Sequence, residues 1–196
     1  MNTRRRLTAF HEAGHALAFW WNGQPIARVT VRTEAEAQAG PMVDLRGHVL
    51  HVEGLVEADY FVLHPALNAR GIAEYLPSMV ESIERDLVDC FAGPVAEALH
   101  RHTESDPFSS GGGGADRQRG FELISLLPER KLLDAESQAI ARCNRLVRRY
   151  WPAVTALADL LQTQGSVDGK SISALLSELT GESPRLRGNP LASLDR

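Results

Sequence analysis

Small and apolar residues recur at helical spacing in several stretches of this chain. The first stretch runs from about Thr3 to Trp21, contains no proline, and ends where Asn22-Gly23-Gln24-Pro25 breaks the pattern. Its repeating positions are Leu7, Phe10, Gly14, Leu17 and Trp21. Comparable spacing predicts further helices from Pro77 to about Leu99 and over residues 116–127, 129–150, 152–164 and 169–179.

Alternating apolar and polar residues mark two short stretches in the N-terminal third. These are Ile26–Arg32 and Gly47–Val52, and the turn signal Gly40-Pro41 lies between them. They predict a small sheet of two or three strands. Because the first of these strands follows the first helix closely, we expect its edge to pair with an extended peptide.

These patterns together predict one α+β, mainly helical domain with a small β-sheet near residues 26–52. The chain has 196 residues, of which 43% are hydrophobic, so it is long enough to bury one substantial core. Its last residues, Gly181 to Arg196, mix Pro, Gly, Arg and Ser without periodicity. We therefore expect a folded domain over residues 1–180 and a flexible tail over residues 181–196.

Charge and composition narrow the expected environment and partners. The formal net charge is −4, so we expect no nucleic-acid partner, and the four arginines between residues 142 and 149 are interpreted as a solvated face. No apolar run approaches the roughly 20 residues that a membrane-spanning helix needs. The two cysteines lie far apart in helical stretches, which argues against a disulfide. These features predict a cytoplasmic protein without a membrane segment.

The first predicted helix carries two histidines and a glutamate in the run His11-Glu12-Ala13-Gly14-His15. Residues four apart lie on one helical face, about 5–6 Å apart at their β-carbons, so both histidines can direct ring nitrogens at one metal ion. Glu12 projects beside that ion, where it can take a proton from a metal-bound water whose pKa zinc lowers to about 7. The spacing is typical of zinc metallopeptidases. A surface helix without a metal is the competing interpretation, which the small residues of this turn disfavour.

A catalytic zinc also needs a third protein ligand, and spacing alone does not fix it. Asp116 opens a predicted helix after the glycines at residues 111–114, where a bending loop can deliver its carboxylate. A plain helix N-cap is the alternative role for this residue. The other candidates are His48, His51, His64, His100 and His102. His48 and His51 lie on a predicted strand, and His100 and His102 cannot both face one side of a helix, so these four suit an ordinary polar role.

Three blocks of sequence follow one another in an order that points to a known family. They are Phe10–Leu17, Phe91–Leu99 and Gly113–Arg119. The first contains the histidine motif, the second is similar to Gly-Gly-Arg-x-Ala-Glu-Glu-Leu, and the third is similar to Gly-Ala-x-x-Asp-Leu-x-x-Ala. In this respect the chain resembles, over most of its length, the peptidase domain of the FtsH family of ATP-dependent zinc metallopeptidases.

The resemblance implies a site and a role for each of its residues. His11, His15 and Asp116 correspond to the zinc ligands of the family, and Glu12 corresponds to its general base. Glu97 falls on the first glutamate of the second block, where the resemblance suggests that it orients a ligand histidine through the other ring nitrogen. The alternative for Glu97 is a solvent-facing position on a helix.

The sequence therefore predicts a zinc metalloendopeptidase that hydrolyses peptide bonds in unfolded or flexible polypeptides. FtsH-family proteins normally carry membrane-spanning segments and an AAA ATPase domain, and we expect neither in this chain. An ATPase acting in trans and a homo-oligomer are the corresponding expectations for its partners. The alternative function is a catalytically idle binding or regulatory module that keeps the metal site. Glu12 favours the enzyme, because a structural zinc needs no base.

Overall fold

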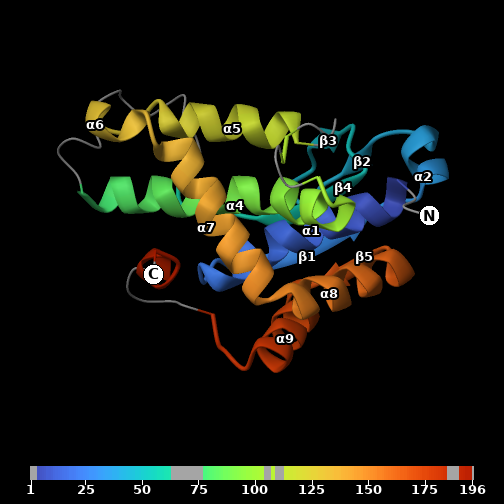
Figure 1. Ribbon diagram of the computed structural model, residues 1–196. Helices are drawn as coiled ribbons and strands as arrows, with labels where there is room; N and C mark the ends of the chain where they lie inside the picture. The colour runs from blue at the N-terminus through green and yellow to red at the C-terminus, as the bar shows by residue number, and fades with distance from the viewer. Residues whose placement is uncertain (1–3, 63–76, 104–106, 109–112, 185–189, 196) are drawn as a thin grey trace.

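Helix α1 (Arg4–Trp21) lies at the centre of the structure, because every residue from Ala9 to Trp21 is buried. The computed structural model describes residues 4–62, 77–103, 107–108, 113–184 and 190–195. Within these ranges the long helix α4 (Pro77–Arg101), the helix α8 (Trp151–Gln164) and a small sheet pack around α1 (Figure 1). Titratable residues in the middle of such a helix must find partners inside the protein.

Small residues let α1 and α4 cross closely. A β-carbon added at Gly14 of α1 would lie 2.4 Å from the carbonyl oxygen of Ala92 on α4, so only glycine fits at this crossing. Buried apolar side chains from both helices belong to one hydrophobic core, among them Phe10, Leu17 and Leu87. The crossing therefore sets one face of α1 directly against the backbone of α4.

The main sheet has three antiparallel strands in the order β4-β1-β5. β1 (Ile26–Val31) pairs with β4 (Gly54–Ala58) on one side and with β5 (Ser166–Asp168) on the other. The prediction that the strand at 26–32 offers its edge to a peptide is therefore wrong, because both of its edges are paired. Within the described ranges, β4 is an edge strand instead.

The predicted strand at residues 47–52 contributes only a short segment to a separate hairpin. In this hairpin β2 (Met42–Val43) pairs with β3 (Val49–Leu50). A short helix that the pattern did not predict, α2 (Glu34–Ala39), precedes the hairpin and begins with a capping box at Thr33. The chain then reaches the main sheet only after Glu53.

The second half of the chain is helical, with one break that the periodicity did not reveal. The predicted helix over residues 129–150 divides into α6 (Glu129–Leu132) and α7 (Ala135–Arg149). The break falls at Leu133, whose side chain is 95% exposed. It allows α7 to change direction and cross α4, as Figure 1 shows, while α5 (Gly114–Ile124) runs beside α4.

The end of the chain packs against the helices, which differs from the flexible tail predicted for residues 181–196. Beyond α9 (Gly169–Thr180), the short 3₁₀ helix η2 (Pro190–Ser193) buries Leu191 and the next turn buries Leu194. Two isolated leucines give no periodic signal, so the sequence pattern could not show this contact. Residues 190–195 therefore belong to the folded domain, and residues 185–189 and 196 lie outside the described part.

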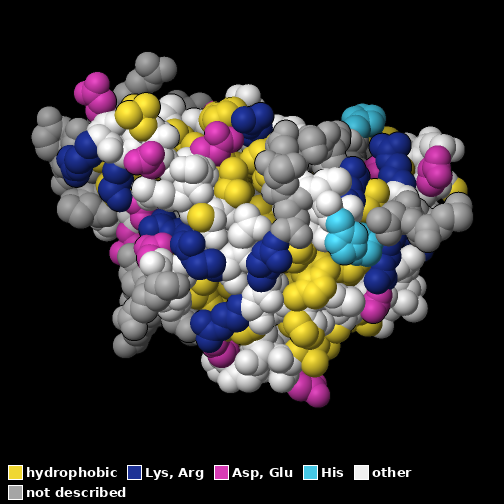
Figure 2. Space-filling model, in the orientation of Figure 1, with side chains coloured by type: hydrophobic (Ala, Val, Ile, Leu, Met, Phe, Trp, Pro, Cys, Tyr) yellow, Lys and Arg dark blue, Asp and Glu magenta, His cyan; other side chains and the backbone are white. Residues whose placement is uncertain are grey.

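The four arginines of α7 between residues 142 and 149 form an arginine stripe, and several of them have acidic partners. Arg142 donates two hydrogen bonds of 2.7 and 2.8 Å to the Asp195 carboxylate, and Arg145 lies 3.5 Å from the same group. Arg149 lies 2.9 Å from Glu182. Basic side chains are scattered among acidic and apolar ones on the face that α7 crosses (Figure 2). This part of the stripe thus helps to anchor the chain end.

The structure confirms the α+β, mainly helical class with small antiparallel sheets. Its buried apolar side chains join into a core cluster that draws on α1, α4, the main sheet and the C-terminal helices. None of the helices in the described ranges combines the length and apolar character needed to cross a lipid bilayer.

The docked chain end can be tested with a pair of leucine variants. We expect Leu194→Ala to lower the free energy of unfolding by about 2–3 kcal/mol, because it leaves a cavity at a buried site. Leu133→Ala, at the exposed helix break, is the control and should change it by less than about 0.5 kcal/mol. Urea unfolding measures both, and equal effects of the two variants would contradict a packed chain end.

Candidate metal centre

The two histidines of α1 lie one turn apart and face the same point. Their Nε2 atoms are 3.0 Å apart, and both residues are buried. The other ring nitrogen of each is already used: His11 Nδ1 lies 3.0 Å from Glu97 Oε2, and His15 Nδ1 donates a hydrogen bond of 2.6 Å to the Asp89 carbonyl oxygen. These contacts favour the tautomer that leaves both Nε2 atoms free to bind a metal.

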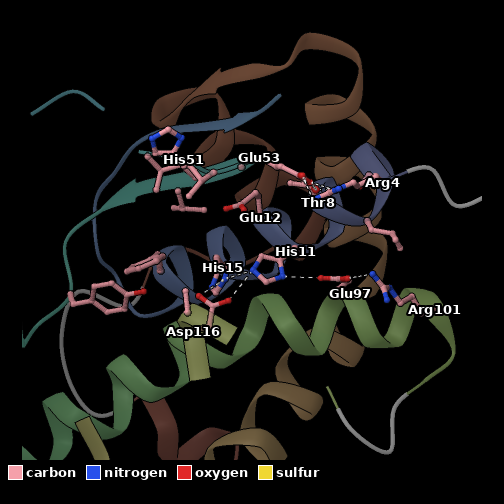
Figure 3. Close-up of a pocket in the computed structure, with 18 residues that line it drawn as sticks. Arg4, Thr8, His11, Glu12, His15, His51, Glu53, Glu97, Arg101 and Asp116 are labelled. Carbon is pink, nitrogen blue, oxygen red and sulfur yellow. Dashed lines mark hydrogen bonds and ion pairs between the residues drawn. The ribbon is translucent and has the colours of Figure 1, made fainter. Parts of the chain in front are cut away.

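Asp116 completes this group from the far side of the cavity. Its Oδ2 lies 3.1 Å from His11 Nε2 and its Oδ1 lies 3.5 Å from His15 Nε2 (Figure 3). The residue stands in the first turn of α5, and Gly113 is the N-cap of that helix. The alternative role of Asp116 as a plain N-cap is therefore wrong, and its carboxylate points at the histidines instead.

The spacing of these three side chains would allow them to hold one metal ion. A tetrahedral zinc with bonds of about 2.0–2.1 Å holds its ligand atoms about 3.3 Å apart. Here the two Nε2 atoms are 3.0 Å apart, and each lies 3.1 or 3.5 Å from a different oxygen of the Asp116 carboxylate. One ligand atom from each residue lies within 4.8 Å of the other two. In the part of the chain that the structure describes, this is the one cluster of three or more suitable side chains close enough to share an ion.

Charge also suits a cation at this point. Burial alone would raise the pKa of Asp116, but the neighbouring His15 and His11 outweigh it and hold that pKa well below its usual range. Burial alone would lower the pKa of His11, yet hydrogen bonds to Asp116 and Glu97 outweigh it and raise the pKa to about 10. The acidic groups around the two histidines therefore favour positive charge at this point.

Two glycines on neighbouring elements make room for the site. A β-carbon at Gly93 of α4 would lie 2.2 Å from His15 Nε2, so this ring can reach its position only because residue 93 has no side chain. A β-carbon at Gly54 of β4 would lie 2.5 Å from Glu12 Oε1. Both the ligand histidine and the predicted base are thus packed against bare backbone.

Glu12 lies beside the ligand group but is not a member of it. It lines the same cavity of about 680 Å³, and only 6% of its surface is exposed. Burial raises its pKa, while the nearby His11 and His15 act in the opposite direction. Figure 3 shows its carboxylate between the ligand histidines and β4. This placement leaves Glu12 available for proton transfer within the cavity.

A buried acidic residue that the sequence analysis did not single out holds part of the cavity wall. The Asp86 carboxylate accepts hydrogen bonds of 2.8 and 2.6 Å from the backbone N–H groups of Phe61 and Val62. Burial raises the pKa of Asp86 to about 6. Tyr60, which precedes Phe61 in the chain, lines the cavity and packs edge-on against Phe19. Asp86 therefore anchors the backbone directly after Tyr60, a residue of the cavity lining.

The remaining histidine candidates do not join the ligand group. His48 is exposed and pairs with Asp44 on the hairpin, and His51 lines the cavity wall outside the cluster. His100 stacks on Phe10 with ring centroids 3.8 Å apart. His102 is exposed in a left-handed conformation after α4. His64 lies outside the described residues.

No family model matches this chain, and no curated protein matches it either. The functional interpretation therefore depends on the geometry of the site. The structure brings His11, Glu12, His15 and Asp116 together around one cavity, as the sequence predicted. Glu97 is buried beside His11.

The glycine below His15 gives a direct test of the metal centre. We expect Gly93→Ala to weaken zinc binding by about 10-fold or more, because its methyl group displaces the ligand ring from its position. Gly114→Ala is the matched control, since nothing lies within 4 Å of a β-carbon there. Competition with a chromophoric chelator measures both affinities. Zinc binding by Gly93→Ala at wild-type strength would show that this ring is not a ligand.

Proposed function

We propose that this chain is a zinc-dependent metallopeptidase with a site like that of the FtsH peptidase domain. The observation that carries the proposal is the position of Glu12, a buried carboxylate beside the His11, His15 and Asp116 group in one open cavity. A metal held only for structure would need no carboxylate of this kind beside it. The geometry thus supports hydrolysis better than a binding module that merely keeps the metal.

The residues divide the chemical work between them. Zinc, when bound to His11, His15 and Asp116, supplies a water with a pKa near 7 and a Lewis acid for the substrate carbonyl. Glu12 accepts a proton from the attacking water and returns it to the leaving amine. Burial raises the pKa of Glu12, which makes it a stronger base than an exposed glutamate. Glu97 and the Asp89 carbonyl keep the two imidazoles in the required orientation.

The edge strand β4 is the element best placed to hold a substrate. Residues 51–56 line the cavity, and Gly54 lies directly against Glu12. Since β4 is paired with β1 on one side only, its other edge can add an extended peptide as a further strand. A peptide bound this way would run along the cavity past Glu12 and the proposed ligand group. This geometry favours unfolded or flexible polypeptides over folded ones, and an ATPase partner in trans remains a prediction.

Substrate pairing with β4 can be followed by amide hydrogen exchange. We expect a bound peptide to slow exchange by about 10-fold at the N–H groups of residues 54–58 that point away from β1, since new backbone hydrogen bonds protect them. The Glu12→Gln variant keeps the peptide intact during the measurement. The opposite sheet edge, β5, is the internal control and should not change. Protection of β5 alone, or of neither strand, would exclude this mode of binding.

Hydrolysis itself is tested by removing the base. We expect Glu12→Gln to lower the rate of casein cleavage by about 10²–10⁴-fold while zinc still binds. Glu136→Gln is the control, because Glu136 pairs with Arg117 and is not among the residues that line the cavity. Full activity of Glu12→Gln would contradict the mechanism. Zinc binding by a wild-type protein that cleaves no flexible substrate would instead favour the regulatory module.

A further inference from the structure

Glu97 has a second partner on the side away from the metal centre. Glu97 lies in α4, where only 4% of its surface is exposed. Its Oε2 faces His11 Nδ1 at 3.0 Å, and its Oε1 accepts the guanidinium of Arg101, one helical turn further along. Figure 3 shows this line of contacts running from Arg101 through Glu97 to His11 and Asp116. A charged group in the last turn of α4 is thus linked to a proposed metal ligand.

We propose that Arg101 is a positioning residue that sets the metal affinity of His11 through Glu97. This inference rests on the proposed zinc site and extends it by one residue. A carboxylate removed from water needs polar partners for both of its oxygens, and here Oε2 meets His11 while Oε1 meets Arg101. Arg101 holds the carboxylate in the rotation that presents Oε2 to the imidazole.

The orientation of Glu97 matters because it controls the ring of His11. A carboxylate on Nδ1 fixes the tautomer, aims Nε2 at the metal and makes the imidazole a stronger donor. Without Arg101 the Glu97 carboxylate loses the partner of its Oε1, so the rotation that presents Oε2 to His11 is held less firmly. His11 would then lose the contact that keeps its Nε2 near Asp116. Zinc should bind more weakly although all three ligands are still present.

A second arginine pair at the same cavity provides a matched comparison. Arg4 contacts Glu53, as Arg101 contacts Glu97, and both pairs line the cavity. The two differ in burial, since the Arg4 side chain is 73% exposed and that of Arg101 is 31% exposed. They also differ in their link to the proposed metal ligands: Glu97 contacts His11, whereas no hydrogen bond or ion pair joins Glu53 or Arg4 to either histidine. Exposed ion pairs of the first kind contribute little, so only the second pair is expected to affect the metal.

The experiment compares zinc affinity in the full chain and its variants by competition with a chromophoric chelator. We expect Arg101→Met to weaken zinc binding by about 10-fold and Arg101→Lys, which keeps the charge, to restore part of the loss. Arg4→Met should stay within about twofold of wild type. In a Glu97→Gln background, Arg101→Met should add little, because Arg101 acts through Glu97. If Arg101→Met does not fold, Arg101→Gln takes its place.

Each other outcome overturns the inference. Three results would show that Arg101 does not act through Glu97. Arg101→Met could bind zinc as tightly as wild type, or Arg4→Met could lose as much zinc affinity as Arg101→Met. Arg101→Met could also lower zinc affinity as much in the Glu97→Gln background as in the wild type. An increase in KM for a peptide substrate with unchanged zinc affinity would identify Arg101 as a substrate contact instead. These results leave the zinc site itself standing. Absence of zinc binding in the wild-type protein would overturn the proposed function together with the inference.

Discussion

The close crossing of α1 and α4 is the constraint on which the metal centre depends. At this crossing Gly14 lies against the Ala92 carbonyl and His15 lies over Gly93, so backbone rather than side chains separates the helices. The same crossing brings Glu97 within hydrogen-bond distance of His11. Because both histidine rings are held from the α4 side, their Nε2 atoms converge on the side where α5 delivers Asp116.

Burial and charge work together in this arrangement. A helix as buried as α1 would ordinarily exclude ionisable groups, and its two histidines are tolerated because polar groups of other elements contact them. His11 contacts Glu97 and Asp116, and His15 contacts the Asp89 carbonyl oxygen and Asp116. Glu12 differs from them, because it faces the cavity rather than a fixed partner. That difference separates a proposed ligand set from a proposed base.

Local patterns in the sequence predicted local features well. The spacing of His11 and His15 is a property of one helix, so it could be interpreted without a fold. Features made by distant segments were harder to predict: β4 as the edge strand depends on its pairing with β1, and Leu194 docks without a periodic pattern. One signal was available but not used, since Arg101 follows Glu97 at i+4 and therefore had to share its helical face.

X-ray absorption at the zinc edge of the zinc-loaded protein is the most direct test of the proposed ligands. Coordination by His11, His15 and Asp116 predicts nitrogen and oxygen neighbours at about 2.0–2.1 Å, with the outer scattering of two imidazole rings and no sulfur. The two cysteines, Cys90 and Cys143, are buried with free thiols and offer the clearest alternative donors. A sulfur neighbour at about 2.3 Å, or a shell without imidazole scattering, would contradict zinc coordination by His11, His15 and Asp116.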